Sequence, residues 1–194
     1  MIKKTIIALG LSASALFATN NIQLNINSNT LELYGEYSLN KTYNLSSDAG
    51  YSFSLSYLGS EKTALNSQST DRQINLGLKI MNPYINDYGF SFGLGVNFVW
   101  VNNSSDSFIA IPLGVYGQYE LNDNISFNSS LSYAPKVLAF SDAKTYTSFD
   151  FKANYRIIDN GHVYIGIRDI KTKYSNNEKL EFDDSIFFGY KVKF

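Results

Sequence analysis

The last ten residues, 185–194, read S-I-F-F-G-Y-K-V-K-F, and this pattern limits what the chain can fold into more than any other feature. Side chains of a β-strand alternate between its two faces. One face carries Ile186, Phe188, Tyr190, Val192 and Phe194, and the other carries Ser185, Phe187, Gly189, Lys191 and Lys193. Chain ends fray and normally lie in water. An apolar stripe that closes on an aromatic ring therefore favours a strand that faces lipid over the edge strand of a soluble protein.

The other end predicts a secretory signal peptide over residues 1–18. Lys3 and Lys4 form a positive n-region, and residues 5–17 form a short, mostly apolar stretch. Cleavage is expected after Ala18, although Ala13-Ser14-Ala15 is a stricter match to the small-residue rule. The stretch is too short to cross a bilayer as a helix. We expect residues 19–194 to form one exported domain.

Composition narrows the chemistry. The chain has no cysteine, which excludes disulfides, thiolate catalysis and cysteine-based metal sites. Aromatic residues make up 15% and charged residues only 17%, while the mean hydropathy is −0.15. A barrel that alternates apolar and polar residues gives such a near-neutral average. The net charge of −1 provides no basic field for nucleic acid. No cofactor, metal ion or nucleic acid is predicted to bind.

Alternation with a period of two recurs along the chain and predicts ten strands. Their expected ranges are 22–26, 31–39, 51–57, 74–80, 90–100, 109–120, 125–133, 149–157, 163–168 and 185–194. One face of each strand is aliphatic and aromatic, and the other is rich in Ser, Asn and Gly.

Loop lengths predict the orientation. Bacterial membrane barrels have an even number of strands, short periplasmic turns and longer outer loops. The expected periplasmic segments are 40–50, 82–88, 122–124 and 159–161. The expected outer segments are 60–73, 102–106, 135–147 and 175–184. An eight-stranded barrel remains the alternative, with the first hairpin packed as a plug or lying free.

Alternation alone does not separate a membrane barrel from a soluble β-sandwich, whose apolar faces pack inward. Three features favour the barrel. The apolar faces are rich in Phe and Tyr, several strands run about nine to thirteen residues as a tilted membrane strand requires, and the polar faces carry few Lys and Glu. We therefore expect an all-β, closed antiparallel transmembrane barrel in the cell outer membrane.

Two stretches resemble known proteins. The terminal residues Phe188, Tyr190, Val192 and Phe194 resemble the assembly signal that outer-membrane barrels present to the barrel assembly machinery. The segment 133–138, Y-A-P-K-V-L, is followed by Tyr146, a long strand over 148–158 and V-Y-I-G-I-R at 163–168. This half of the chain resembles the YfaZ family of outer-membrane proteins. The resemblance implies a small outer-membrane barrel and fixes no biochemical activity.

Catalytic residues are scarce, so we expect no enzyme activity. His162 is the one histidine and follows the Asp159-Asn160-Gly161 turn, at the end opposite to the outer loops. No Ser or carboxylate arrangement around it suggests catalysis, and we interpret it as structural. Glu178, Glu181, Asp183 and Asp184 make the last outer loop acidic, which allows Ca²⁺ binding but favours a solvated loop.

Ten charged residues fall on the polar faces and are expected to line the lumen, because Arg or Lys facing mid-membrane lipid costs about 2–4 kcal/mol. They are Glu32, Glu36, Lys79, Glu120, Asp150, Lys152, Arg156, Arg168, Lys191 and Lys193.

Two functions follow from this set. The charges either pair and close a narrow lumen, in a barrel that anchors surface loops or supports the envelope, or line a thin pore for small solutes. Expected partners are outer-membrane lipid, lipopolysaccharide and the assembly machinery; the sequence identifies no ligand.

Overall fold

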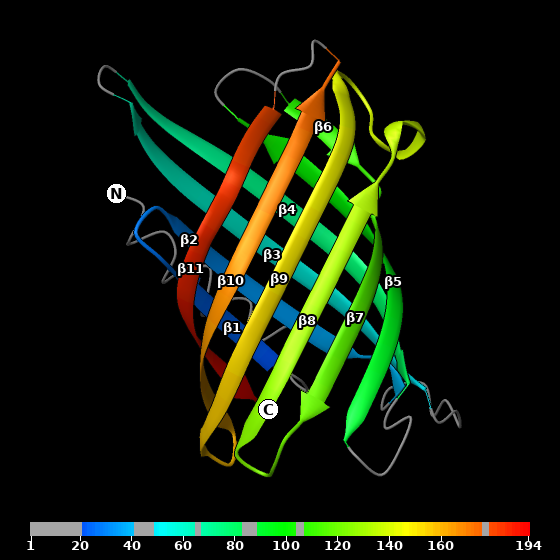
Figure 1. Cartoon of the computed structure of the whole chain (residues 1–194), viewed down its shortest axis with the longest axis vertical. Coiled ribbons are helices and arrows are strands. Elements are labelled where there is room, and N and C mark those ends of the chain that lie inside the picture. Colours follow the sequence, from blue (N-terminus) through cyan, green and yellow to red (C-terminus); the bar gives the residue numbers. More distant parts are fainter. Residues whose placement is uncertain (1–20, 41–48, 65–66, 83–88, 104–106, 176–178) are drawn as a thin grey trace.

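The computed structural model describes residues 21–40, 49–64, 67–82, 89–103, 107–175 and 179–194, which form one antiparallel sheet closed into a barrel (Figure 1). The signal peptide predicted over 1–18 lies outside the described residues. The strands are β1 (Asn21–Ile26), β2 (Thr30–Ser38), β3 (Gly50–Ala64), β4 (Ser67–Asn82), β5 (Phe90–Asn102), β6 (Ser107–Ala110), β7 (Leu113–Glu120), β8 (Ile125–Ala134), β9 (Ala143–Ile158), β10 (Gly161–Tyr174) and β11 (Lys179–Lys193). The sheet closes through β4–β5 and β1–β11 pairing. No helix in the described part of the chain is long and apolar enough to cross a membrane.

These segments make a ten-stranded barrel, as the alternation predicts, because β6 and β7 are two parts of one interrupted strand. Both pair with the same edge of β5. The interruption falls at Pro112, which has no N–H to donate to the ladder. The Pro112 carbonyl still accepts a hydrogen bond from Asn97 N at 2.9 Å, whereas Ile111 N donates to Leu138 O at 2.8 Å. The continuous strand predicted over 109–120 is therefore wrong at this position. β1 pairs with β2 and β11, so the first hairpin belongs to the wall.

Three of the loops that the sequence predicts as outer are shorter in the structure than expected. β3 and β4 stay paired as far as Ala64 and Ser67, and β9 and β10 stay paired as far as Ala143 and Tyr174. The loops predicted over 60–73, 135–147 and 175–184 shrink because the backbone ladder continues after apolar alternation has stopped. The predicted acidic loop is therefore wrong, because β11 contains Glu181, Asp183 and Asp184. Glu178 lies outside the described residues.

The wall follows the alternation. On β5 the side chains of Phe92, Leu94 and Val96 point outward and are 38–57% exposed, whereas Ser91 and Asn97 point inward and are at most 8% exposed. Burying such outward side chains in lipid instead of water stabilises the barrel by about 1.5–3 kcal/mol for each large side chain.

The lumen has two halves of different chemistry. Near the hairpins that follow β5, β8 and β10, inward side chains form an apolar cluster, here called the plug. It consists of Leu58, Val99, Val101, Phe108, Ala110, Ala134, Ala139, Ala143, Tyr146, Ile170, Tyr174 and Phe182, with Leu138 and Leu180 packed against it. The 3₁₀ turn η1 (Lys136–Leu138) bends the β8–β9 connection over it, and Phe140 N donates to Ile109 O at 2.8 Å. The other half of the lumen is polar.

Candidate functional site

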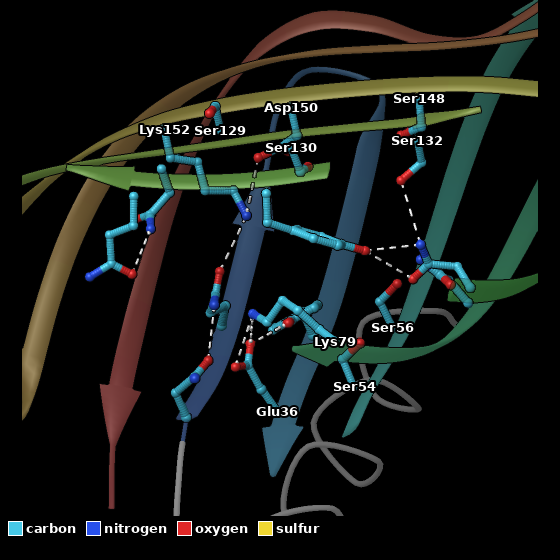
Figure 2. Close-up of a pocket in the computed structure, with 18 of the residues that line it drawn as sticks. Glu36, Ser54, Ser56, Lys79, Ser129, Ser130, Ser132, Ser148, Asp150 and Lys152 are labelled. Carbon is cyan, nitrogen blue, oxygen red and sulfur yellow. Dashed lines mark hydrogen bonds and ion pairs between the residues drawn. The ribbon is translucent and has the colours of Figure 1, made fainter. Parts of the chain in front are cut away.

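The polar half of the lumen encloses a cavity of about 490 Å³. It reaches from Gln73 and Ser132, below the plug, to Asn21 and Lys193 at the end of the barrel that carries the turns after β7 and β9, here called the short-turn end. Figure 2 shows serines of β3, β8 and β9 around it, together with the charged residues Glu36, Lys79, Asp150 and Lys152. Its volume falls within the range of small-molecule sites, about 300–1,000 Å³. The inward faces of successive strands supply its side chains, because period-two alternation places every second residue in the lumen.

Arg168 of β10 organises the charges directly below the plug. Its guanidinium contacts Glu32 of β2, lies 3.4 Å from Asp150 of β9, and lies 3.5 Å from Asp183 of β11. The side chain is only 5% exposed, and it stacks over the Phe187 ring at 4.6 Å from the ring centroid. A planar guanidinium offers five donors, so it can serve several carboxylates at once. This network ties four strands together across the curved wall.

The carboxylates of the network have further donors. Asn25 Nδ2 donates to Glu32 at 2.5 Å. Asp183 accepts from Ser185 Oγ at 2.5 Å and from Thr30 Oγ1 at 3.2 Å. Buried charged groups are stable only when hydrogen bonds also reach the carboxylate oxygens that the ion pairs leave free.

Two lysines in the cavity have carboxylate partners. Lys79 Nζ lies 3.1 Å from Glu36 Oε1, and Glu36 also accepts a hydrogen bond from Tyr34 at 2.5 Å. Lys152 Nζ lies 3.5 Å from Asp150 and 3.3 Å from Gln23 Oε1. Figure 2 shows the Glu36–Lys79 pair on one side of the cavity and Asp150 with Lys152 on the other.

The structure brings together eight of the ten charges assigned to the lumen from the sequence. Glu32, Glu36, Lys79, Asp150, Lys152, Arg168, Lys191 and Lys193 line the cavity. Glu120 and Arg156 lie outside its lining, at the short-turn end: Glu120 accepts from Gln118 at 3.0 Å, and Arg156 donates to Asn124 at 3.4 Å. The lining thus holds five cations and three carboxylates.

Sequence reasoning did not predict the apolar cluster of inward side chains that is called the plug here. Phe108 contacts Tyr146 and Tyr174 with ring centroids 6.3 and 5.9 Å apart, and Tyr146 OH donates to Gln73 Oε1 at 3.3 Å. A signal was available in the run Val99-Trp100-Val101, where both faces of the strand are apolar. Such a run indicates a strand that is buried on its inner face as well as its outer one.

The remaining candidates are at the short-turn end and on the outer wall. His162 faces inward, is 8% exposed, and its Nδ1 has no hydrogen-bond partner in the described structure. Within the described residues, no group of three or more His, Cys, Asp or Glu could hold a metal ion. In the terminal stripe, Phe188, Tyr190 and Phe194 face outward and are 42–62% exposed, and Val192 is half-buried.

A closed ten-stranded barrel with an apolar outer wall and a partly polar lumen defines the class of this protein: it is an outer-membrane β-barrel and resides in the outer membrane. The family model described as "YfaZ precursor" matches residues 66–194, and the chain belongs to the YfaZ family. This confirms the family resemblance seen in the sequence.

Several solved structures are similar to this chain, and the first of the three below shows the fold. A NanC porin is 13% identical with a TM-score of 0.51, over 90% of this chain and 98% of that chain. Outer-membrane expressed OmpT of Vibrio cholerae is 13% identical with a TM-score of 0.39, over 85% of this chain and 56% of that one. A KdgM porin is 11% identical with a TM-score of 0.39, over 91% and 99%. None of the curated proteins that were compared matches the sequence.

Proposed function

We propose that this protein is a non-enzymatic outer-membrane barrel whose lumen is closed at the loop end, and that it acts through its surface loops and its contacts with the envelope. The single observation that supports a closed lumen is the plug. Phe108, Tyr146 and Phe182 are at most 2% exposed, so their rings are packed on all sides. An apolar constriction excludes water and ions even before it is sterically sealed.

Under this proposal, the function depends on residues that are exposed on the outside of the barrel and not on the lumen. Val137 in η1 is 80% exposed and Phe140 is 46% exposed, at the end that carries the hairpins after β8 and β10. Lipid and lipopolysaccharide contact the wall, and the barrel assembly machinery acts on the chain during insertion. In the described part of the cavity lining the carboxylates are paired with cations, an arrangement that supports a structural role over a catalytic one.

Conductance in planar bilayers tests the closed lumen. The wild-type barrel is expected to give no reproducible current steps. The double variant Phe108→Ala, Phe182→Ala removes two rings of the plug and is expected to create small steps. A matched control, Phe92→Ala with Phe98→Ala, removes two outward rings and should stay silent. Reproducible steps from the wild type would overturn the proposal.

A second function, a narrow pore for small solutes, is favoured by the 490 Å³ polar cavity below the plug and its excess of cations. The fold shared with a structure described as a NanC porin is compatible with it. Under this alternative, the wild type conducts and its reversal potential in a salt gradient shows selectivity for anions, since the uncompensated charges are lysines.

A further inference from the structure

A cluster of three cationic side chains and one histidine lies at the short-turn mouth of the lumen and has no role in the closed-barrel proposal. It consists of Arg156, His162, Lys191 and Lys193, here called the mouth cluster. His162 is directly opposite Lys191 on β11 and directly opposite Arg156 on β9. Lys193 follows two residues after Lys191 on the same inward face. Three adjacent strands thus present four nitrogen-bearing side chains in neighbouring positions.

These groups lack carboxylate partners. Among the described residues, no ion pair joins Arg156, Lys191 or Lys193 to a carboxylate, although each of Lys79, Lys152 and Arg168 deeper in the lumen has one. Their neighbours on β1 are neutral, because Gln23 is opposite Lys191 and Asn21 is opposite Lys193. The carboxylate nearest in register is Glu36, opposite Asn21 on β2, and its ion pair is with Lys79.

Such an arrangement is unfavourable without a counter-charge. Like charges on neighbouring positions repel, and the repulsion grows as the groups are removed from water. Arg156 and Lys191 are half-buried, whereas Lys193 is exposed. His162 adds a second observation, because its buried Nδ1 has no hydrogen-bond partner. Lys191 and Lys193 also line the cavity, so a molecule bound there would contact them.

We propose that the mouth cluster binds a small multivalent oxyanion, a phosphate-bearing solute, that enters from the short-turn side. The guanidinium of Arg156 suits paired phosphate oxygens, and the two lysines act as point charges. Serines of the lining, such as Ser129 and Ser130, donate hydrogen bonds to the uncharged part of the solute. The cluster faces the lumen, so the site takes a solute and not a lipid headgroup.

Isothermal titration of pyrophosphate into the full-length barrel, folded in a nonionic detergent, tests the site. The wild type should bind with an affinity that falls as salt rises. The variant Lys191→Gln, Lys193→Gln should lose affinity by roughly tenfold or more, as expected when charged hydrogen-bond donors are removed. Replacing both lysines with Arg should retain binding.

A matched control removes the same charge elsewhere. Lys173 and Lys179 are also opposite one another, but they are exposed near the other end of the barrel. Lys173→Gln with Lys179→Gln should leave pyrophosphate binding unchanged. Each variant is first checked for folding by its heat-dependent gel migration, and Arg156→Gln provides a second loss variant if the lysine pair is needed for folding.

No binding by the wild type, or equal losses in the mouth and control variants, would overturn the proposal. Loss of pyrophosphate binding in vesicles that contain anionic phospholipid, with retention in zwitterionic ones, would also overturn it, because the site would then bind a headgroup. These results do not depend on conductance, so the site can fail while the closed-lumen proposal stands, and the reverse.

Discussion

Replacing Arg168 by Met should destabilise the barrel by about 3–5 kcal/mol, the typical effect of removing one partner from a buried ionic network. The guanidinium contacts Glu32 and lies 3.4 and 3.5 Å from Asp150 and Asp183. At an effective dielectric constant of about 20, one ion pair at 3.5 Å contributes about 5 kcal/mol of attraction, before desolvation is subtracted. Met fills much of the volume, so the loss reports charge and not a cavity.

The size of this destabilisation depends on burial, and an exposed ion pair on the same strand provides the control. Arg168 and Asp183 are 5% and 4% exposed, whereas Lys171 and Asp169 form a 2.7 Å pair that is 44% and 36% exposed. Exposed pairs contribute about 0–1 kcal/mol. Lys171→Met should therefore leave the urea midpoint close to that of the wild type, although the Lys171–Asp169 pair is shorter than the pairs of Arg168 with Asp150 and Asp183.

Urea titration in lipid vesicles measures both variants, with folded protein followed by gel migration and by the fluorescence of Trp100, the one tryptophan of the chain. Adding Glu32→Gln to the Arg168→Met variant should restore at least part of the stability, because one uncompensated carboxylate is removed. The reasoning fails if Arg168→Met is as stable as the wild type, or if Glu32→Gln lowers the stability of the Arg168→Met variant further.

The remaining predictions concern topology, packing and assembly. Because the chain has no cysteine, Val137→Cys should be labelled on intact cells by an impermeant maleimide and Asp123→Cys should not; the opposite result would invert the orientation. Gly189→Val should destabilise the barrel by several kcal/mol in the same urea titration, since a Cβ there would lie 2.3 Å from Tyr164 ring atoms. Gly50→Val is the control and should be tolerated, because the nearest atom to a Cβ at that position is 3.6 Å away. Unboiled barrel should migrate differently from boiled protein on SDS gels, and identical migration would argue against a closed wall. Phe194→Ala should reduce the amount inserted in cells but leave refolding into detergent intact, whereas normal insertion would separate the terminal stripe from assembly.

The sequence predicts the wall far better than the interior. Strand number and pairing order depend on alternation and turn chemistry, which are local, and the structure has ten strands in consecutive antiparallel pairing. The errors fall at the loop end, where strands continue without an apolar outer face to mark them. At Pro112 a local signal was present, because proline has no N–H to donate. There the structure divides a strand that was predicted to be continuous.

The interior could not be derived in the same way, because alternation shows which residues face the lumen but not at what height they meet. Asp183 illustrates the limit. Strict alternation places Phe182 and Asp183 on opposite faces, yet both are buried, because a bulge opposite Ile170 and Lys171 shifts the register there.

That one-residue shift joins the two halves of the lumen. It places the Phe182 ring in the plug and the Asp183 carboxylate within 3.5 Å of Arg168 directly beneath it. A β-bulge changes the direction in which side chains point and leaves one position of the ladder unpaired. Here it places the plug directly beside the charged network of Arg168. On one side of the bulge the lumen is filled by the apolar side chains of the plug, and on the other side polar and charged side chains line the cavity. The contrast between the apolar half and the polar half of the lumen therefore depends on β11, and we expect that mutations can change the plug and the mouth cluster independently of each other.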